Sequence, residues 1–401
     1  MRSSLEADRI RVVSGADLML PRRRLDRPLR VAVVPGDGIG PEVVAATLPL
    51  VRLACRVEGV EVVFTQLEWG SSHYRSHGAF MPDDATDQIK QHDAVLFGAV
   101  GSPDIPDHLP VWGLILELRQ KLDLYVNLRP VHHWAGVRSP IADSEGVDFV
   151  IIRENTEGEY SGLGWRQRIG GLQEVAYEVA VHSHSSIDRI ARYAFEVARA
   201  RKGRLGVATK SNALRYGYVL WDETVRSVAN EYQDVSCEFV LVDALAARII
   251  QRPGSLDVML CSNLFGDILS DLAAPIQGGL GMAPSANFNP QTQVPGVYEP
   301  VHGSAPDICG KGVANPVGCI LSAAMLLEHC GCKRASDSLV QAVADTVSDP
   351  SAHTPDLGGK ATTVEVADRI GEALMAGTQR TPTELEDDGV TEATGMAGEL
   401  R

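Results

Sequence analysis

Two aspartates in the segment CSNLFGDILSDLAAP (261–275) are spaced so that their carboxylates could act together. Asp267 and Asp271 are four residues apart, so a helix would carry both on one face, with aliphatic residues on another. Like charges at this spacing destabilise a free helix by about a few tenths of a kcal/mol, and a divalent cation is a natural partner to offset the repulsion. Carboxylate oxygens suit Mg²⁺ or Mn²⁺. For the two aspartates alone a solvated acidic face is the more frequent explanation, but the segments around them favour the metal.

Three arginines and a lysine lie near the ends of strand-like segments. The stretch LRQKLDLYVNLRPV carries Arg119 and Arg129, and IIRENTEGEYSG carries Arg153. Singly, such arginines are more often surface or structural residues, but together they can grip a small polycarboxylate through bidentate contacts. Lys210 ends another strand-like run, in TKSNALRYG, where an amine can serve as a base. The combination predicts a site for a small acid.

The glycine-rich stretch VAVVPGDGIGPEVV (31–44) raises the question of a nucleotide loop. Gly36 and Gly38 begin the G-x-G-x-x-G fingerprint, but Pro41 occupies the third position. Proline and the following Glu42 suit the first turn of a helix, and the glutamate would disfavour a pyrophosphate there. The ordinary Rossmann interpretation therefore fails, and a tight turn between a strand and a helix is predicted.

The elements that must position these residues alternate along the chain. Apolar strand-like runs occur at 30–35, 60–67, 93–100, 147–154, 204–210 and 256–262, and helical patterns occur at 41–57, 111–122, 185–201 and 216–231. Such alternation predicts an α/β protein with a largely parallel sheet. The segment 171–183 alternates more like half-buried antiparallel strands, which predicts a hairpin or arm.

Bulk composition excludes several classes of protein. The 401 residues, 44% hydrophobic and 22% charged, suit a soluble globular protein of one or two domains. A net charge of −15 argues against nucleic-acid or anionic-membrane partners, which attract basic patches. No apolar run approaches the ~18 residues of a membrane span. The seven cysteines lack a CxxC pair, which favours reduced, mostly buried thiols and a cytoplasmic location.

The two ends of the chain differ from the middle. Residues 1–28 are rich in arginine but also contain four acids, so a flexible arm is predicted rather than a targeting peptide. Residues 378–401 hold six acids against two arginines and are predicted to form a disordered acidic tail. The folded part is predicted to span about 29–377.

Six ordered blocks carry a resemblance to a known family. PGDGIGPE, LRxxLxxxxNLRP, RENTEGEY, KSN, NLFGDILSDL and EPVHGSAPDI…GKGVANP resemble the blocks of the metal-dependent β-decarboxylating dehydrogenases, which act on isocitrate, 3-isopropylmalate, homoisocitrate, D-malate or tartrate. The resemblance covers roughly 29–375. It implies a two-domain α/β/α sandwich with a large mixed, mostly parallel sheet, which is not a Rossmann fold. The implied large, cofactor-binding domain comprises 29–130 plus 285–377, and the small domain 131–284 carries metal ligands and a dimer interface.

The resemblance also implies a role for each matching residue. Tyr160 is the expected general acid and Lys210 the expected base. The expected substrate-binding residues are Arg119, Arg129 and Arg153, and the expected metal ligands are Asp243, Asp267 and Asp271. The expected NAD-binding residues are Asn212, His302, Gly303, Ser304, Ala305, Pro306, Asp307, Ile308 and Asn315. Lys210 and Asp243 would come from the partner subunit, so a homodimer with shared active sites is expected, with Mg²⁺ or Mn²⁺ and K⁺ as candidate cations.

Cofactor choice is predicted from Asp307. An aspartate facing the adenosine ribose accepts hydrogen bonds from free hydroxyl groups and repels a 2′-phosphate. With Ile308 after it, this residue favours NAD over NADP.

Substrate choice is predicted from the helix before Arg119, which reads VWGLILELR. In the isopropylmalate dehydrogenases that this chain resembles, a glutamate stands at the position of Trp112. The tryptophan and the RENTEGEY block of this chain instead resemble the D-malate/tartrate branch. A bulky indole would fill the space that an isopropyl group needs, and the apolar Ile115 and Leu116 lack groups for isocitrate's third carboxylate. We expect D-malate, converted to pyruvate and CO₂, or tartrate.

Two alternatives remain open at this point. The first is a dehydrogenase of 3-isopropylmalate or of another 3-substituted malate. The second, more remote, is a non-catalytic regulatory subunit, which should have lost an arginine, the tyrosine, the lysine or a metal aspartate. All eight of these residues are present, which argues against it.

Overall fold

A computed structural model describes residues 27–378. The predicted N-terminal arm (1–28) and acidic tail (378–401) lie outside these residues except for their innermost positions. The strands are β1 (Leu29–Gly36), β2 (Val62–Gln66), β3 (Ala94–Ala99), β4 (Val126–His132), β5 (Asp148–Glu154), β6 (Gly164–Gln167), β7 (Val175–Glu178), β8 (Arg204–Thr209), β9 (Ser236–Leu241), β10 (Val258–Cys261), β11 (Pro284–Phe288) and β12 (Gly296–Pro300).

Helices connect the strands. They are α2 (Gly40–Glu58), α3 (Ser71–His77), α4 (Ala85–Ile89), α5 (His108–Pro110), α6 (Glu117–Lys121), α7 (His184–Ala200), α8 (Gly217–Ala229), α9 (Val242–Gln251), α10 (Asn263–Ala273), α11 (Val317–His329), α12 (Lys333–Val347) and α13 (Thr363–Thr378). Between α5 and α6 the chain forms a π-helix, η1 (Val111–Leu116). None of the described helices combines the length and apolar composition that crossing a bilayer requires.

One ten-stranded sheet runs through the molecule in the order β2-β1-β3-β12-β11-β4-β5-β10-β8-β9. The strands from β2 to β12 are parallel, as are those from β5 to β9. The pairs formed by β12, β11, β4 and β5 in the middle are antiparallel. This mixed, mostly parallel α/β sheet confirms the predicted fold class.

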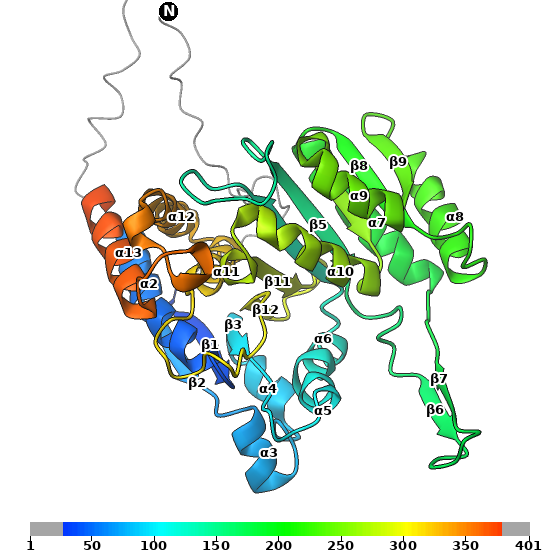
Figure 1. Cartoon of the computed structure of the whole chain (residues 1–401), viewed down its shortest axis with the longest axis horizontal. Coiled ribbons are helices and arrows are strands. Elements are labelled where there is room, and N and C mark those ends of the chain that lie inside the picture. The colour runs from blue at the N-terminus through cyan, green and yellow to red at the C-terminus, as the bar shows by residue number, and fades with distance from the viewer. Residues whose placement is uncertain (1–26, 379–401) are drawn as a thin grey trace, which may run out of the picture.

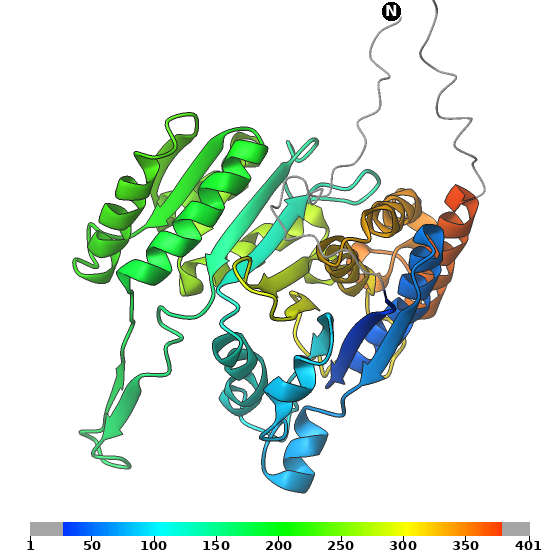
Figure 2. The same ribbon diagram turned by 180° about the vertical axis from the view of Figure 1, so that it is seen from behind.

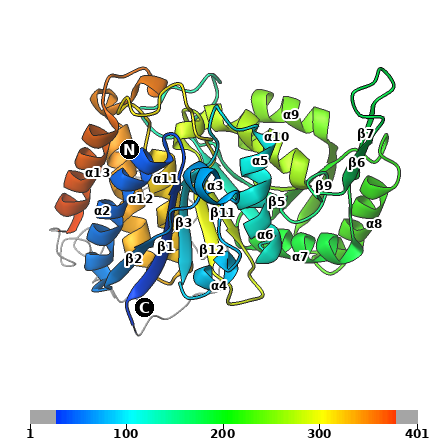
Figure 3. The ribbon, with the colours of Figure 1, turned by 90° about the horizontal axis from the view of Figure 1, so that it is seen from below.

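The helices cover both faces of the sheet at its two ends. Figures 1 and 3 show α2, α12 and α13 together at the end that carries β1 and β2, and α7, α8 and α9 at the end that carries β8 and β9. A second apolar cluster lies on the other face of β1 and β3, under α4, η1 and α6. The antiparallel middle therefore lies between two helix-covered ends.

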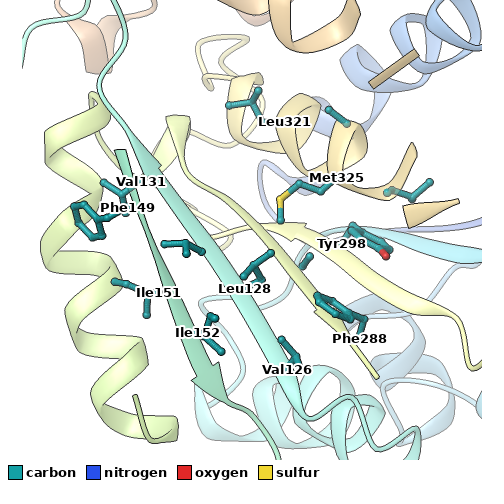
Figure 4. Close-up of a cluster of buried hydrophobic side chains, with 14 of the residues drawn as sticks. Val126, Leu128, Val131, Phe149, Ile151, Ile152, Phe288, Tyr298, Leu321 and Met325 are labelled. Carbon is teal, nitrogen blue, oxygen red and sulfur yellow. The ribbon is translucent and has the colours of Figure 1, made fainter. Parts of the chain in front are cut away.

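The central strands form the densest part of the core. Nearly every residue of β4 and β5 is buried, which suits the continuous apolar run in the middle of β5. Their side chains pack with those of β11, β12 and α11 (Figure 4). The predicted domain division at 130/131 falls inside β4, so the sheet continues across it, and the division into two domains stays a prediction.

The predicted arm is present as a β-hairpin. Strands β6 and β7 pair only with each other in a two-stranded antiparallel sheet, and Figures 1 and 2 show them extending away from the rest of the chain. Every residue of both strands is exposed. The ring of Trp165 stacks on that of Tyr177, with 4.7 Å between centroids.

Candidate active site

Asp267 and Asp271 share one face of a helix, as their spacing predicts. Helix α10 begins directly after β10, and Arg129 Nη1 lies 3.5 Å from Asp267 Oδ1 and 3.6 Å from Asp271 Oδ1. Asp267 is partly buried, whereas Asp271 is largely exposed. Two carboxylates and a buried guanidinium thus lie close together on this face of α10.

The three predicted arginines come together around these carboxylates. Arg153, at the end of β5, is 1% exposed and forms an ion pair with Asp267. Arg129 extends from the middle of β4. Arg119, on α6, is also buried, and its Nη2 lies 2.7 Å from Glu299 Oε1. The three arginines thus lie together, and their role in gripping a polycarboxylate stays a prediction.

The electrostatics of the cluster follow from burial. Burial lowers the pKa of the Arg129 guanidinium and lowers that of Arg153 to about 10, so both are cations at neutral pH. Burial also disfavours the charged form of Asp267, but the guanidinium groups of Arg153 and Arg129 outweigh that effect and hold its pKa below the ordinary value. The buried guanidinium groups of Arg129 and Arg153 therefore stay charged beside the cavity, where they can attract an anionic ligand.

A cavity of about 390 Å³ opens onto this cluster. One wall is polar and consists of the three arginines, Tyr160 and Asp267. The opposite wall is helical, and Trp112, Ile115 and Leu116 of η1 make it largely apolar. The π-helical turn that forms this wall is a rare element that often occurs at functional sites.

Tyr160 and Trp112 border the same cavity from different segments. The Tyr160 hydroxyl donates a hydrogen bond to Asp267 Oδ2 at 3.2 Å. Burial and then the charge of Asp267 raise the pKa of the Tyr160 phenol, so it stays protonated. The Trp112 ring lies over Gly162, where an added Cβ would be 3.1 Å from it. Gln120 Nε2 donates to the Tyr160 carbonyl at 3.1 Å, which ties the tyrosine loop to α6.

Lys210 and Asp243 do not line this cavity within one chain. Lys210 follows β8 and Asp243 lies in the first turn of α9, and the two side chains form an ion pair. The hydrogen bond from Lys210 lowers the pKa of Asp243. The neighbouring Asn212 is exposed. Among the described residues, no three His, Cys, Asp or Glu side chains are grouped to hold a metal ion. The predicted ligand set is therefore not assembled by one chain, and its assembly with a partner subunit stays a prediction.

The predicted cofactor loop packs directly on the glycine-rich turn. Gly36 and Gly38 have φ of +71° and +58°, and a Cβ on Gly38 would lie 1.9 Å from the Ser304 carbonyl oxygen. Ile39 N donates to that oxygen at 2.9 Å. Ala305 has φ +39°, a backbone conformation that is rare for a residue with a side chain. Only glycine fits at this turn, which supports the predicted strand-to-helix turn.

The other predicted cofactor residues occupy varied surroundings. Gly303, Pro306 and Asp307 are exposed, while Ser304, Ala305 and Ile308 are half-buried. His302 is buried, and its Nε2 has no hydrogen-bond partner among the described residues. Asn315 uses its amide within the chain, since Nδ2 donates to Asp356 and Oδ1 accepts from the Val317 amide.

Three partners of the arginines were missed by the sequence analysis. Glu299 pairs with Arg119, Asn263 Oδ1 accepts from Arg153, and Ser270 Oγ accepts from Arg129. Helical spacing from Asp267 would have found Asn263 and Ser270. No local pattern would have found Glu299, which is 180 residues from Arg119.

Known proteins share the sequence and the fold of this chain. Residues 30–373 match the family described as isocitrate/isopropylmalate dehydrogenase. The chain is 46% identical over 352 residues to a probable tartrate dehydrogenase/decarboxylase of Agrobacterium vitis, covering 87% of this chain and 98% of that protein. It is 44% identical to the decarboxylating D-malate dehydrogenase of Escherichia coli K12, covering 87% and 99%. The crystal structure of isocitrate dehydrogenase from Methylococcus capsulatus superimposes with a TM-score of 0.80 at 35% identity, covering 86% of this chain and 99% of that one.

Proposed function

The chain belongs to the isocitrate/isopropylmalate dehydrogenase family and is a decarboxylating dehydrogenase, and we propose that it oxidises D-malate or tartrate with NAD and a divalent cation. One observation carries the choice of substrate. The indole of Trp112 lies over Gly162 and narrows the apolar side of the cavity. A four-carbon dicarboxylate has no substituent to place on this apolar side, whereas the isopropyl group of 3-isopropylmalate would need space beside the indole. The names of the similar tartrate and D-malate enzymes support the same choice.

The residues at the cavity fit a divalent cation. Asp267 and Asp271 offer hard oxygen ligands on one helix face. Burial raises the pKa of Asp271, and the neighbouring charge of Asp267 acts in the same direction, so a cation would relieve the repulsion between them. When bound, the cation would activate the substrate hydroxyl and accept electron density during loss of CO₂, and NAD would accept the hydride.

The chain's own side chains account for binding and proton transfer. Arg119, Arg129 and Arg153 hold the two carboxylates of the substrate and fix the C–H bond that is broken. Lys210 of the partner subunit takes the hydroxyl proton. Tyr160, whose raised pKa keeps it protonated, delivers a proton to the carbon that loses CO₂.

The loop around Asp307 fits the adenosine half of NAD. Asp307 is exposed, and its carboxylate can accept hydrogen bonds from ribose hydroxyl groups. The buried Nε2 of His302 has no partner among the described residues and is free to bond a cofactor. An NADP 2′-phosphate would face the negative charge of Asp307, which favours NAD.

A homodimer completes the proposed site. Exposed apolar side chains gather on the β6–β7 arm and on the loop that follows Lys210: Trp165, Ile169, Leu172, Val175, Tyr177, Leu214 and Tyr216. An apolar set of this size marks an interface, and the partly exposed Lys210 directly precedes the loop that carries Leu214 and Tyr216. Pairing two chains through this surface would bring Lys210 and Asp243 to the partner's cavity.

Complementation tests the shared site. A Tyr160→Phe chain and a Lys210→Ala chain should each form a poorly active homodimer. Tyr160 and Lys210 of one site come from different chains, so the mixed dimer retains one intact site out of two. Its specific activity should therefore be about half of that of the wild-type dimer. Activity of the mixed dimer equal to the mean of the two parents would contradict a shared site.

Cofactor and metal dependence test the proposed reaction. With D-malate, we expect NADH to form in the presence of Mn²⁺, to stop with a chelator, and to resume when Mn²⁺ is restored. NADP⁺ should support a much lower kcat/KM than NAD⁺, and replacing Asp307→Ser should reduce that preference. Undiminished turnover in a chelator would refute the metal requirement.

A further inference from the structure

Helix α10 presents one stripe of residues to the two buried arginines. Asn263, Gly266, Asp267, Ser270 and Asp271 recur at the spacing of a single helix face. The aspartates carry charge, but the other three residues are neutral. Asn263 and Ser270 accept hydrogen bonds from the arginines, and Gly266 leaves room for the Arg153 side chain.

Arg153 is held mainly by neutral groups of this stripe. Its Nε and Nη2 donate to Asn263 Oδ1 at 2.9 and 2.8 Å. The aliphatic part of the Arg153 side chain packs closely against α10 at Gly266, where an added Cβ would be only 2.6 Å from the Arg153 Cβ. Asn263 Nδ2 donates to the Glu157 carbonyl at 2.8 Å. The amide orientation of Asn263 is thereby fixed, and only Nη1 of Arg153 is left for Asp267.

Arg129 shows a similar arrangement about two turns further along α10, at Ser270. Its Nη1 donates to Ser270 Oγ at 2.6 Å, whereas the nearest oxygens of Asp267 and Asp271 lie at 3.5 and 3.6 Å. Ser270 Oγ in turn donates to the Asp267 carbonyl at 2.9 Å. The closest partner of the Arg129 guanidinium is therefore neutral, whereas Arg153 combines a neutral acceptor, Asn263, with its ion pair to Asp267.

We propose that Asn263 and Ser270 are positioning residues that keep Arg153 and Arg129 directed at the substrate once a cation has drawn the carboxylates of Asp267 and Asp271 away. This inference rests on the proposed metal-dependent function. A buried guanidinium that loses its only acceptor is strongly destabilised. Neutral acceptors avoid that cost without competing for the cation.

Removal of either acceptor has a defined consequence. In Asn263→Ala, Nε and Nη2 of Arg153 lose their acceptor, and the guanidinium turns fully onto Asp267. Arg153 then occupies a carboxylate that the cation requires and points away from the substrate. The affinities for Mn²⁺ and for the dicarboxylate should therefore fall together. Ser270→Ala removes a single oxygen, so it should fold normally and produce a smaller version of the same effect.

The experiment is an equilibrium titration of the full-length protein without NAD, so that no turnover occurs. D-malate and tartrate are titrated in the presence of Mn²⁺, and Mn²⁺ is titrated alone. A hydrogen bond to a charged group contributes about 1.5–3 kcal/mol, which predicts a Kd for the acid about ten- to a hundredfold higher in Asn263→Ala. Thr346→Val is the matched control, because Thr346 Oγ1 makes a buried bond to the Ala342 carbonyl in α12. It should lower the Tm but leave both Kd values unchanged.

A crystal structure of Asn263→Ala separates failure of this inference from failure of the proposed function. Unchanged Kd values in Asn263→Ala and Ser270→Ala would overturn the inference. If the wild type binds neither acid, the proposed function is wrong, and the position of Arg153 then decides the inference alone. We expect its guanidinium to shift onto Asp267 in the variant. A guanidinium that keeps its wild-type orientation would overturn the positioning role.

Discussion

Trp112 should limit the size of the substrate that the cavity accepts, and Trp112→Ala should allow a larger substrate to bind. The ring lines the cavity, is in contact with Gly162 and is 37% exposed. Removing it frees space for the three carbons of an isopropyl group. At about 0.8 kcal/mol per buried CH₂, those carbons are worth roughly 2.4 kcal/mol, which corresponds to about a 50-fold change in kcat/KM.

The assay compares kcat/KM for 3-isopropylmalate and D-malate in the wild type and in Trp112→Ala. We expect the ratio of the two values to shift toward 3-isopropylmalate by about 10- to 100-fold, since one missing methylene in a pocket is worth about 1–3 kcal/mol. Val364→Ala is the control, because this exposed side chain lies on α13 and does not line the cavity. An unchanged ratio in Trp112→Ala would refute the size argument.

Three further outcomes follow from the site. Tyr160→Phe should slow decarboxylation more than oxidation, so the β-keto acid should accumulate; product analysis after a single turnover checks this, and equal slowing of both steps would contradict it. Asp267→Asn should weaken Mn²⁺ binding at least about tenfold, measured by direct Mn²⁺ titration, and full activity in this variant would sink the metal assignment. Gly38→Ala should lower the Tm and the affinity for NADH together, because φ is +58° and the Cβ would lie 1.9 Å from the Ser304 carbonyl oxygen; a wild-type Tm would show that the turn can relax.

The helix that carries the aspartates was predictable from local pattern alone. The spacing of Asp267 and Asp271, with aliphatic residues between them, fixes both on one face of α10, and the structure has them there. The end of a strand-like run likewise predicted Arg153 at the end of β5. Periodicity determines such positions without reference to the rest of the chain.

The central strand β4 could not be predicted from its local sequence pattern. Its segment contains Asn127, Arg129 and Pro130, which argue against a buried strand, yet nearly all of it is buried. Tertiary contacts override this preference. Asn127 Nδ2 donates to Asn287 Oδ1 across 160 residues, and Arg129 Nη1 donates to Ser270 Oγ across 141 residues. Such pairings depend on the antiparallel order of the middle strands, which composition and periodicity do not determine.

Steady-state NADH formation across a panel of acids tests the central claim most directly. The purified protein is assayed with NAD⁺, Mn²⁺ and K⁺ against D-malate, L- and meso-tartrate, 3-isopropylmalate and isocitrate, with CO₂ release measured in parallel. We predict the highest kcat/KM for D-malate or a tartrate. A kcat/KM that is highest for 3-isopropylmalate or isocitrate by a large factor would contradict the substrate assignment, and an absence of NADH with every acid would contradict the proposed activity.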